Sequence, residues 1–189
     1  MDAIEVKDQL QMIARIIATA DRTVRFRGVI FIVWGLLGAG LNLLSQSFVN
    51  GSLSPNPWAF LGIAGWLGAV VYTIFYARGA KTAGCLNVTE MQFLRILYIA
   101  LGCAMVVNIG AYNLFTGWAQ GAIWSLASAI PLMFVGLQGP RVALYGGLIL
   151  LGSIVAANFA GHSAGYMLAL GDIVGYAGLG VALELKHRG

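Results

Sequence analysis

The stretch "AGYMLALGDIVGYAGLGVALE", Ala164 to Glu184, is an apolar run in which Asp172 is the only charged residue before the closing glutamate. An α-helix rises about 1.5 Å per residue, so about 20 apolar residues cross the roughly 30 Å hydrocarbon layer of a membrane. The run lacks the period-two alternation of a half-buried strand. It therefore predicts a membrane-spanning helix with one carboxyl group in its interior.

Similar apolar segments precede this one, and the composition fits them. Of the 189 residues, 59% are hydrophobic and only 10% are charged, whereas about a quarter are charged in soluble domains. The 26 glycines suit a bundle of closely packed membrane helices. We therefore expect an all-α polytopic membrane protein, with an amphipathic helix over residues 1–27, a six-helix transmembrane bundle over 28–185 and a tail at 186–189. The predicted spans are approximately 28–48, 58–77, 93–115, 118–137, 141–160 and 164–184.

The basic residues indicate the orientation of this bundle. All 11 fall before the first span or near those ends of the later spans that share its side of the membrane. The positive-inside rule then predicts that the N and C termini are cytoplasmic. This placement accounts for the net charge of +4 without a nucleic-acid partner, so the expected environment is the lipid bilayer.

The segment before the first span has a different pattern. Apolar residues between Val6 and Val24 recur at spacings of four and three, as on one face of a helix. Residues 2–26 therefore predict a cytoplasmic helix that lies on the membrane, packs under its own bundle or pairs with another copy. Together with "RFRGVIFIVWG", Arg25 to Gly35, this segment resembles a group of bacterial multi-span inner-membrane proteins in which such a helix leads into a Trp-Gly first span. The resemblance covers about the first 40 residues and implies a bacterial inner membrane, but no activity.

Motifs for catalysis are missing from the sequence. "ALGD", which ends at Asp172, is one residue from the "GxGD" of intramembrane aspartyl proteases, but no second membrane-embedded aspartate is present to form a dyad. His162 and His187 fall on opposite sides of the predicted membrane, which argues against a Ser–His pair or a haem or metal site. Cys85 and Cys103 have no partner at metal-ligand or redox spacing. We expect no enzyme, no cofactor and no metal centre.

Asp172 is the main clue to function, because a carboxyl group near the bilayer centre costs about 2.5–3.5 kcal/mol on insertion scales. Counted from the outer ends of their helices, Asp172 lies at a depth of about 12 Å, Asn42 at about 9 Å, and Asn108 and Ser125 at about 10 Å. Tyr176 falls on the face of Asp172 and is a predicted hydrogen-bond donor to it. A polar layer at this level is therefore expected.

Pro131 interrupts the fourth predicted span near this layer. It removes the hydrogen bond to the carbonyl of Ala127, beside Ser128. The layer has three interpretations: a site for a proton, a cation or a small polar solute; hydrogen bonding that only joins helices; or a carboxyl group at a subunit interface.

Two functions follow from these interpretations. The first is a small channel-like or transporter-like protein, oligomeric or part of a larger membrane complex, that uses Asp172. Its size is similar to that of six-span urea and acetate channels, although "NPWAFLG", Asn56 to Gly62, departs from the acetate-channel motif "NPAPLGL". The alternative is a non-catalytic accessory or regulatory subunit that docks a partner through residues 2–26.

Overall fold

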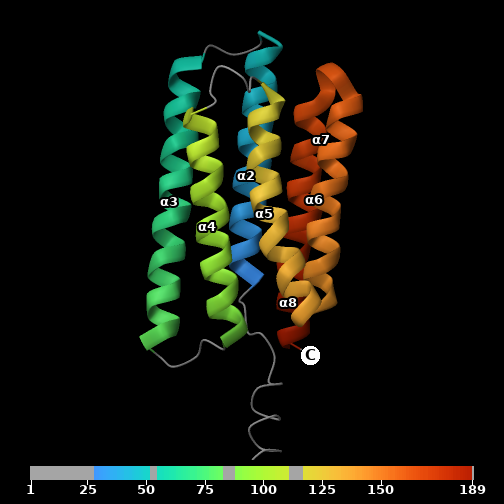
Figure 1. Cartoon of the computed structure of the whole chain (residues 1–189). Coiled ribbons are helices and arrows are strands. Elements are labelled where there is room, and N and C mark those ends of the chain that lie inside the picture. Colours follow the sequence, from blue (N-terminus) through green and yellow to red (C-terminus); the bar gives the residue numbers. More distant parts are fainter. Residues whose placement is uncertain (1–27, 52–54, 83–87, 111–116, 189) are drawn as a thin grey trace, which may run out of the picture.

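The computed structural model describes residues 28–51, 55–82, 88–110 and 117–188, and every regular element within these ranges is helical. The predicted helix at residues 1–27 lies outside the described residues. Successive long helices run antiparallel and form a single bundle (Figure 1). They are α2 (Gly28–Val49), α3 (Pro55–Thr82), α4 (Val88–Gly110), α5 (Trp118–Gln138) and α6 (Arg141–Ala160), followed by α7 (Ala164–Gly171) and α8 (Gly178–Arg188), which continue in one direction.

The last predicted span is not one regular α-helix. A short 3₁₀ turn, Gly161–Ser163, reverses the chain after α6. Between α7 and α8 lies a π-helical turn, η2 (Asp172–Ala177), which begins at the aspartate itself. A π turn holds more residues than an α turn and occurs in helices mainly as a short insertion, frequently at a functional site. Because the π turn begins at Asp172, this residue is a candidate functional residue.

Hydropathy supports a membrane protein. Four segments of the described residues are long and apolar enough to cross a membrane, namely Gly28–Phe48, Gln92–Gly110, Trp118–Gln138 and Arg141–Leu185. This count does not support the predicted six spanning helices. Large apolar side chains also cover the outside of the bundle, including Phe159, Leu137 and Val106, which are 84%, 75% and 70% exposed. A surface of this kind is stable when lipid covers it.

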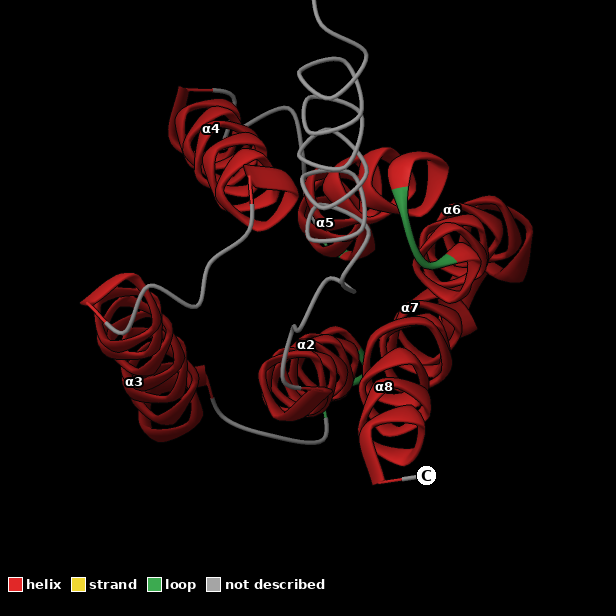
Figure 2. Ribbon diagram, turned by 90° about the horizontal axis from the view of Figure 1, so that it is seen from below, coloured by secondary structure: helices red, strands yellow, loops and turns green. Residues whose placement is uncertain are grey.

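Helix α2 lies between α3 and α8 and contacts several other helices. It packs against α3 and α5 and, along its whole length, against α7, η2 and α8 (Figure 2). The first described helix and the last are thus antiparallel partners, although most of the chain separates them in sequence. Helix α4 packs against α5, and α5 against α6.

Apolar and aromatic side chains fill the space between these helices. The ring of Phe31 on α2 lies 5.9 Å from the ring of Phe93 on α4 and 5.9 Å from that of Tyr176 on η2, measured between centroids. Tilted pairs at this distance are favourable for aromatic rings. Leu132 and Leu150 are fully buried in the same cluster. This core fixes the lower half of α2 against η2 and α5.

The α2 and α7–α8 pair is also capped at both ends. Near the end of α2, Oε1 of Gln46 accepts a hydrogen bond of 2.8 Å from the backbone N–H of Gly165 in the first turn of α7. At the other end, Oε1 of Glu184 on α8 accepts one of 3.3 Å from the N–H of Val29 in the first turn of α2. The first N–H groups of a helix have no partner within it, so such acceptors stabilise the start of each helix. Each helix thereby fixes the position of the other along the shared axis.

Candidate functional site

The candidate site lies on one face of α2. Gly38, Asn42 and Gln46 are spaced four residues apart, so their positions lie on one side of the helix, and all three contact α7 or η2. This face covers Asp172 and the start of α7. The polar groups of the site therefore come from α2, early in the chain, and from α7 and η2, late in the chain.

Asp172 and Asn42 form the centre of this site. Nδ2 of Asn42 donates a hydrogen bond of 2.8 Å to Oδ2 of Asp172, and the side chains are only 8% and 6% exposed. Among the described residues, Asn42 is the only side chain that hydrogen-bonds this carboxyl group. The segment Ala164–Leu185 has no basic residue, so the partner of the acid is a neutral amide. The carboxyl group therefore points into the bundle, and within the described ranges its side-chain hydrogen bond comes from an uncharged group.

Glycines on α2 make room for the acidic turn. A methyl group at Gly38 would lie 2.7 Å from Oδ2 of Asp172, and one at Gly35 would lie 2.8 Å from the backbone oxygen of the same residue. Contacts this short would force the π turn away from α2. The two glycines thus allow η2 to pack against the helix and allow the carboxyl group to reach Asn42.

Tyr176 does not reach the predicted acceptor. Its side chain is 7% exposed, and its hydroxyl donates a hydrogen bond of 3.4 Å to the backbone oxygen of Ser128 on α5. Ser128 belongs to the turn before Pro131, next to Ala127, whose carbonyl loses its N–H donor at the proline. Tyr176 therefore ties η2 to α5 below the aspartate, and the hydrogen bond that Asp172 accepts comes from Asn42.

The other two predicted site residues have different surroundings. Ser125 on α5 is 3% exposed, and its hydroxyl has no hydrogen-bond partner among the described residues. Asn108 on α4 is partly buried, and its Nδ2 donates a hydrogen bond of 3.1 Å to the carbonyl of Ala104 in its own helix. Among the predicted residues, a direct hydrogen bond thus joins only Asp172 and Asn42.

Sequence reasoning missed Gln46 and the glycines that face the polar side chains. Gln46 is 5% exposed and donates to the carbonyl of His162 at 2.6 Å, in addition to accepting from Gly165. Its spacing of four residues from Asn42 is the sequence signal that could have placed it on the same face of the helix. The glycines gave no comparable signal, because 26 of them are distributed through the chain.

The contact between α6 and α7 has a separate feature. A shallow apolar groove of about 240 Å³ lies between α6 and α7, and Gly152, Ser153 and Met167 are among the residues that line it. Asp172 is not part of its lining. Within the described ranges no group of three or more His, Cys, Asp or Glu side chains could hold a metal ion. Cys103 is a free, exposed thiol on α4, and Cys85 lies outside the described residues.

Comparisons of the chain with protein-family models, with curated proteins and with solved structures find no match.

Proposed function

We propose that this chain is a six-span membrane protein in which Asp172 binds a proton, a cation or a small polar solute during transport. The observation that carries the proposal is the buried carboxyl group with a single neutral partner, Asn42. An isolated charge costs several kcal/mol in a low-dielectric interior, so the group requires a proton or a cation. Ionisable residues within membrane spans commonly mark ion or substrate pathways.

Six membrane-spanning segments are consistent with the way in which the helices are arranged in the bundle. The stretch Arg141–Leu185 is 45 residues long, and it reverses at Gly161–Ser163 so that α6 and α7–α8 lie side by side. We count it as two spans, and α3, 28 residues long and parallel to the bundle axis, as another (Figure 1). With α2, α4 and α5 these make six.

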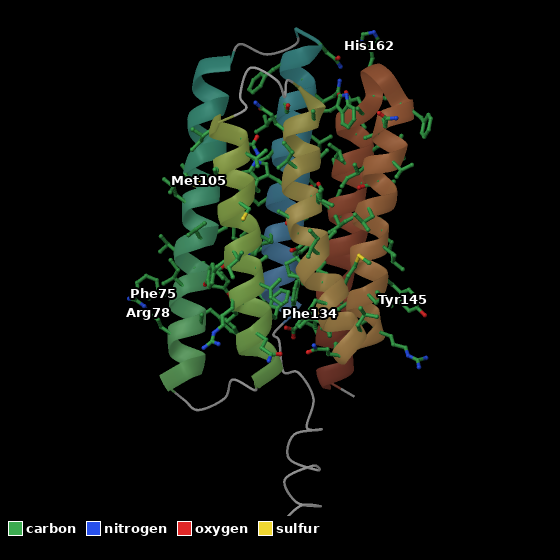
Figure 3. The ribbon with its side chains drawn as sticks, viewed as in Figure 1. Phe75, Arg78, Met105, Phe134, Tyr145 and His162 are labelled. Atoms are coloured by element: carbon green, nitrogen blue, oxygen red, sulfur yellow. The ribbon has the colours of Figure 1, made fainter. Side chains whose placement is uncertain are left out.

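The ends of the bundle support an orientation with cytoplasmic termini. Arg78 near the end of α3 lies at the same end of the bundle as Tyr145 near the start of α6, and His162 lies at the opposite end (Figure 3). Arg95 and Arg141 stand near the starts of α4 and α6, at the first of these ends. By the positive-inside rule this basic end faces the cytoplasm of a bacterial inner membrane.

Transport through Asp172 is tested with the purified protein in liposomes. Protons and Na⁺ are supplied in separate gradients, and a dye reports the internal pH while a radioactive tracer reports Na⁺ entry. We expect flux above that of protein-free liposomes in one of these assays, and we expect Asp172→Asn to abolish it. Glu184→Gln removes the other carboxyl group of the last span, outside the site, and should retain the flux.

The second candidate function is that of a non-catalytic accessory subunit, and the tight packing around η2 favours it. The glycine contacts of η2 and the capping by Gln46 and Glu184 are features of a packed structural interface. On this basis Asp172 would join helices in an accessory subunit, whose docking segment at residues 2–26 lies outside the described residues. Absence of flux in the wild-type liposomes, with a lower melting temperature for Asp172→Asn, would favour this function over transport.

A further inference from the structure

Three side-chain oxygens, one each on the buried residues Asp172, Asn42 and Ser125, have no hydrogen-bond donor among the described residues. Oδ2 of Asp172 accepts from Asn42, but its Oδ1 accepts no hydrogen bond from the described groups. Oδ1 of Asn42 has no donor either and lies against Gly121 of α5, where a Cβ would meet it. The hydroxyl of Ser125 is the third. Most buried polar atoms in proteins have a partner, so three without one call for an explanation.

The contacts of α5 place Ser125 on the side of this helix that faces Asn42 and Asp172. Gly121 contacts Asn42 and Leu168, and Ser128 accepts the hydrogen bond from Tyr176. Ser125 lies four residues after Gly121 and three before Ser128, so the three residues form one stripe along the same face of α5. Along the last span Asp172 likewise falls between Leu168 and Tyr176, at spacings of four. The serine and the aspartate therefore stand at the same level of two facing stripes.

The chemistry of these atoms selects the kind of ligand. Carboxylate, amide and hydroxyl oxygens are hard ligands that suit hard cations, and an anion would be repelled by the aspartate. The set contains one negative charge. A monovalent cation neutralises that charge, whereas a divalent ion would leave an uncompensated positive charge within the hydrocarbon layer. Membrane transporters likewise bind Na⁺ near the bilayer midplane, where backbone carbonyls supply oxygen ligands.

We propose that Asp172, Asn42 and Ser125 form a binding site for one small monovalent cation of the size of Na⁺, enclosed by α2, α5 and η2. The inference rests on the proposed function, since it names the ligand of the same carboxyl group. Ser125 completes the site from a third helix. Binding of the cation therefore stabilises the contact between α5 and the α2–η2 pair.

The test is thermal unfolding of the purified full-length protein in detergent with NaCl, at constant ionic strength maintained with choline chloride. A ligand that binds only the folded state raises the melting temperature as its concentration rises. We expect this increase for the wild type with Na⁺. Ser125→Ala should reduce the apparent Na⁺ affinity by at least about tenfold, as expected for a lost interaction with a charged group. Asp172→Asn should abolish the response.

Ser153→Ala is the matched control. Ser153 is also buried, but its hydroxyl donates a hydrogen bond of 2.7 Å to the carbonyl of Leu150 in its own helix, so the variant should retain the wild-type response. Ser125→Ala should fold, because it removes a hydroxyl that has no partner among the described residues. A wild-type melting temperature that does not respond to NaCl would overturn the site. An equal response of wild type and Ser125→Ala would also overturn it.

These results separate the two proposals. If proton flux depends on Asp172 while Na⁺ does not affect stability, the transport function stands and the cation site is wrong. If Na⁺ binds with the expected dependence on Ser125 but neither flux is found, the site stands and transport is wrong.

Discussion

Gly28 of α2 and Gly180 of α8 face each other so closely that neither position has room for a side chain. A Cβ at Gly28 would meet the backbone oxygen of Gly180, and a Cβ at Gly180 would meet the backbone oxygen of Gly28. Contact between backbones is a common means of helix association in membranes, where packing and interhelical hydrogen bonds replace the hydrophobic driving force. The cap formed by Glu184 lies one turn beyond this contact.

Gly180→Ala should therefore separate α8 from α2. We expect the free energy of unfolding to fall by about 1–3 kcal/mol, the usual cost of overpacking. Thermal or denaturant unfolding in detergent measures the change. Gly178→Ala is the control, because a Cβ there would lie 3.7 Å from the backbone oxygen of Ile173, which is an ordinary contact. Equal destabilisation of the two variants would contradict the prediction.

Gln46→Leu should remove the side-chain hydrogen bonds that cap the start of α7. The buried N–H of Gly165 and the carbonyl of His162 each lose a partner, which costs about 1–3 kcal/mol. We expect faster hydrogen exchange at the amide of Gly165, followed by mass spectrometry, and a lower melting temperature. Gln138→Leu, at an exposed position at the end of α5, should leave both quantities near the wild-type values.

The hydrogen bond between Trp34 and Thr73 should contribute to the packing of α3 against α2. Nε1 of Trp34 donates to Oγ1 of Thr73 at 2.9 Å, and Thr73 is 3% exposed. Trp34→Phe and Thr73→Val each remove one partner. In a double-mutant cycle of unfolding free energies we expect a coupling of about 0.6 kcal/mol, the average for such bonds in membranes. Additive effects of the two substitutions would show that the bond contributes nothing.

Deletion of one residue in η2 should be tolerated unusually well. The capping by Gln46 fixes the start of α7, and the Gly28–Gly180 contact with the cap of Glu184 fixes α8, so the π turn accommodates an additional residue between two fixed segments. Deleting Val174, an exposed residue, should convert the π turn to an α turn with both fixed segments in place.

A deletion of Leu148 serves as the comparison. This exposed residue lies within the regular helix α6, where losing a residue would rotate everything after it by about 100°. We expect the Val174 deletion to lower the melting temperature less than the Leu148 deletion does. The reverse order would show that η2 does not accommodate an additional residue in this way.

Hydrophobicity predicted the helical class of the chain because each helix needs an apolar surface toward lipid. For α6 the predicted limits and the observed ones, Arg141–Ala160, are the same, since Pro140 precedes the helix and Gly161, with φ of 54°, follows it. The π turn was not predictable, because its sequence is as apolar as that of an α-helix. Its geometry depends on Gly35 and Gly38 of a distant segment.

The polar layer shows a second limit of sequence reasoning. Depth along a helix follows from counting residues, and Asn42 and Asp172 lie together as their depths suggested. The direction in which a side chain points around its helix axis depends on the tertiary packing, which residue counting does not reveal. Asn108 lies at a similar predicted depth, yet its hydrogen bond stays within α4. Tyr176 shares the face of Asp172, yet the approach of α5 offers its hydroxyl a carbonyl of Ser128.

The pairing of α2 with α7–α8 has a consequence for biosynthesis. Asn42 and Gln46 are part of an early helix, but the groups that satisfy them are synthesised more than a hundred residues later. At about 5–20 residues per second, a ribosome needs on the order of ten seconds for that interval. During this time the amides of the nascent protein must find temporary partners, such as water, lipid headgroups or an insertion factor. A transcript truncated before codon 164 should therefore yield a product that the membrane quality-control proteases degrade.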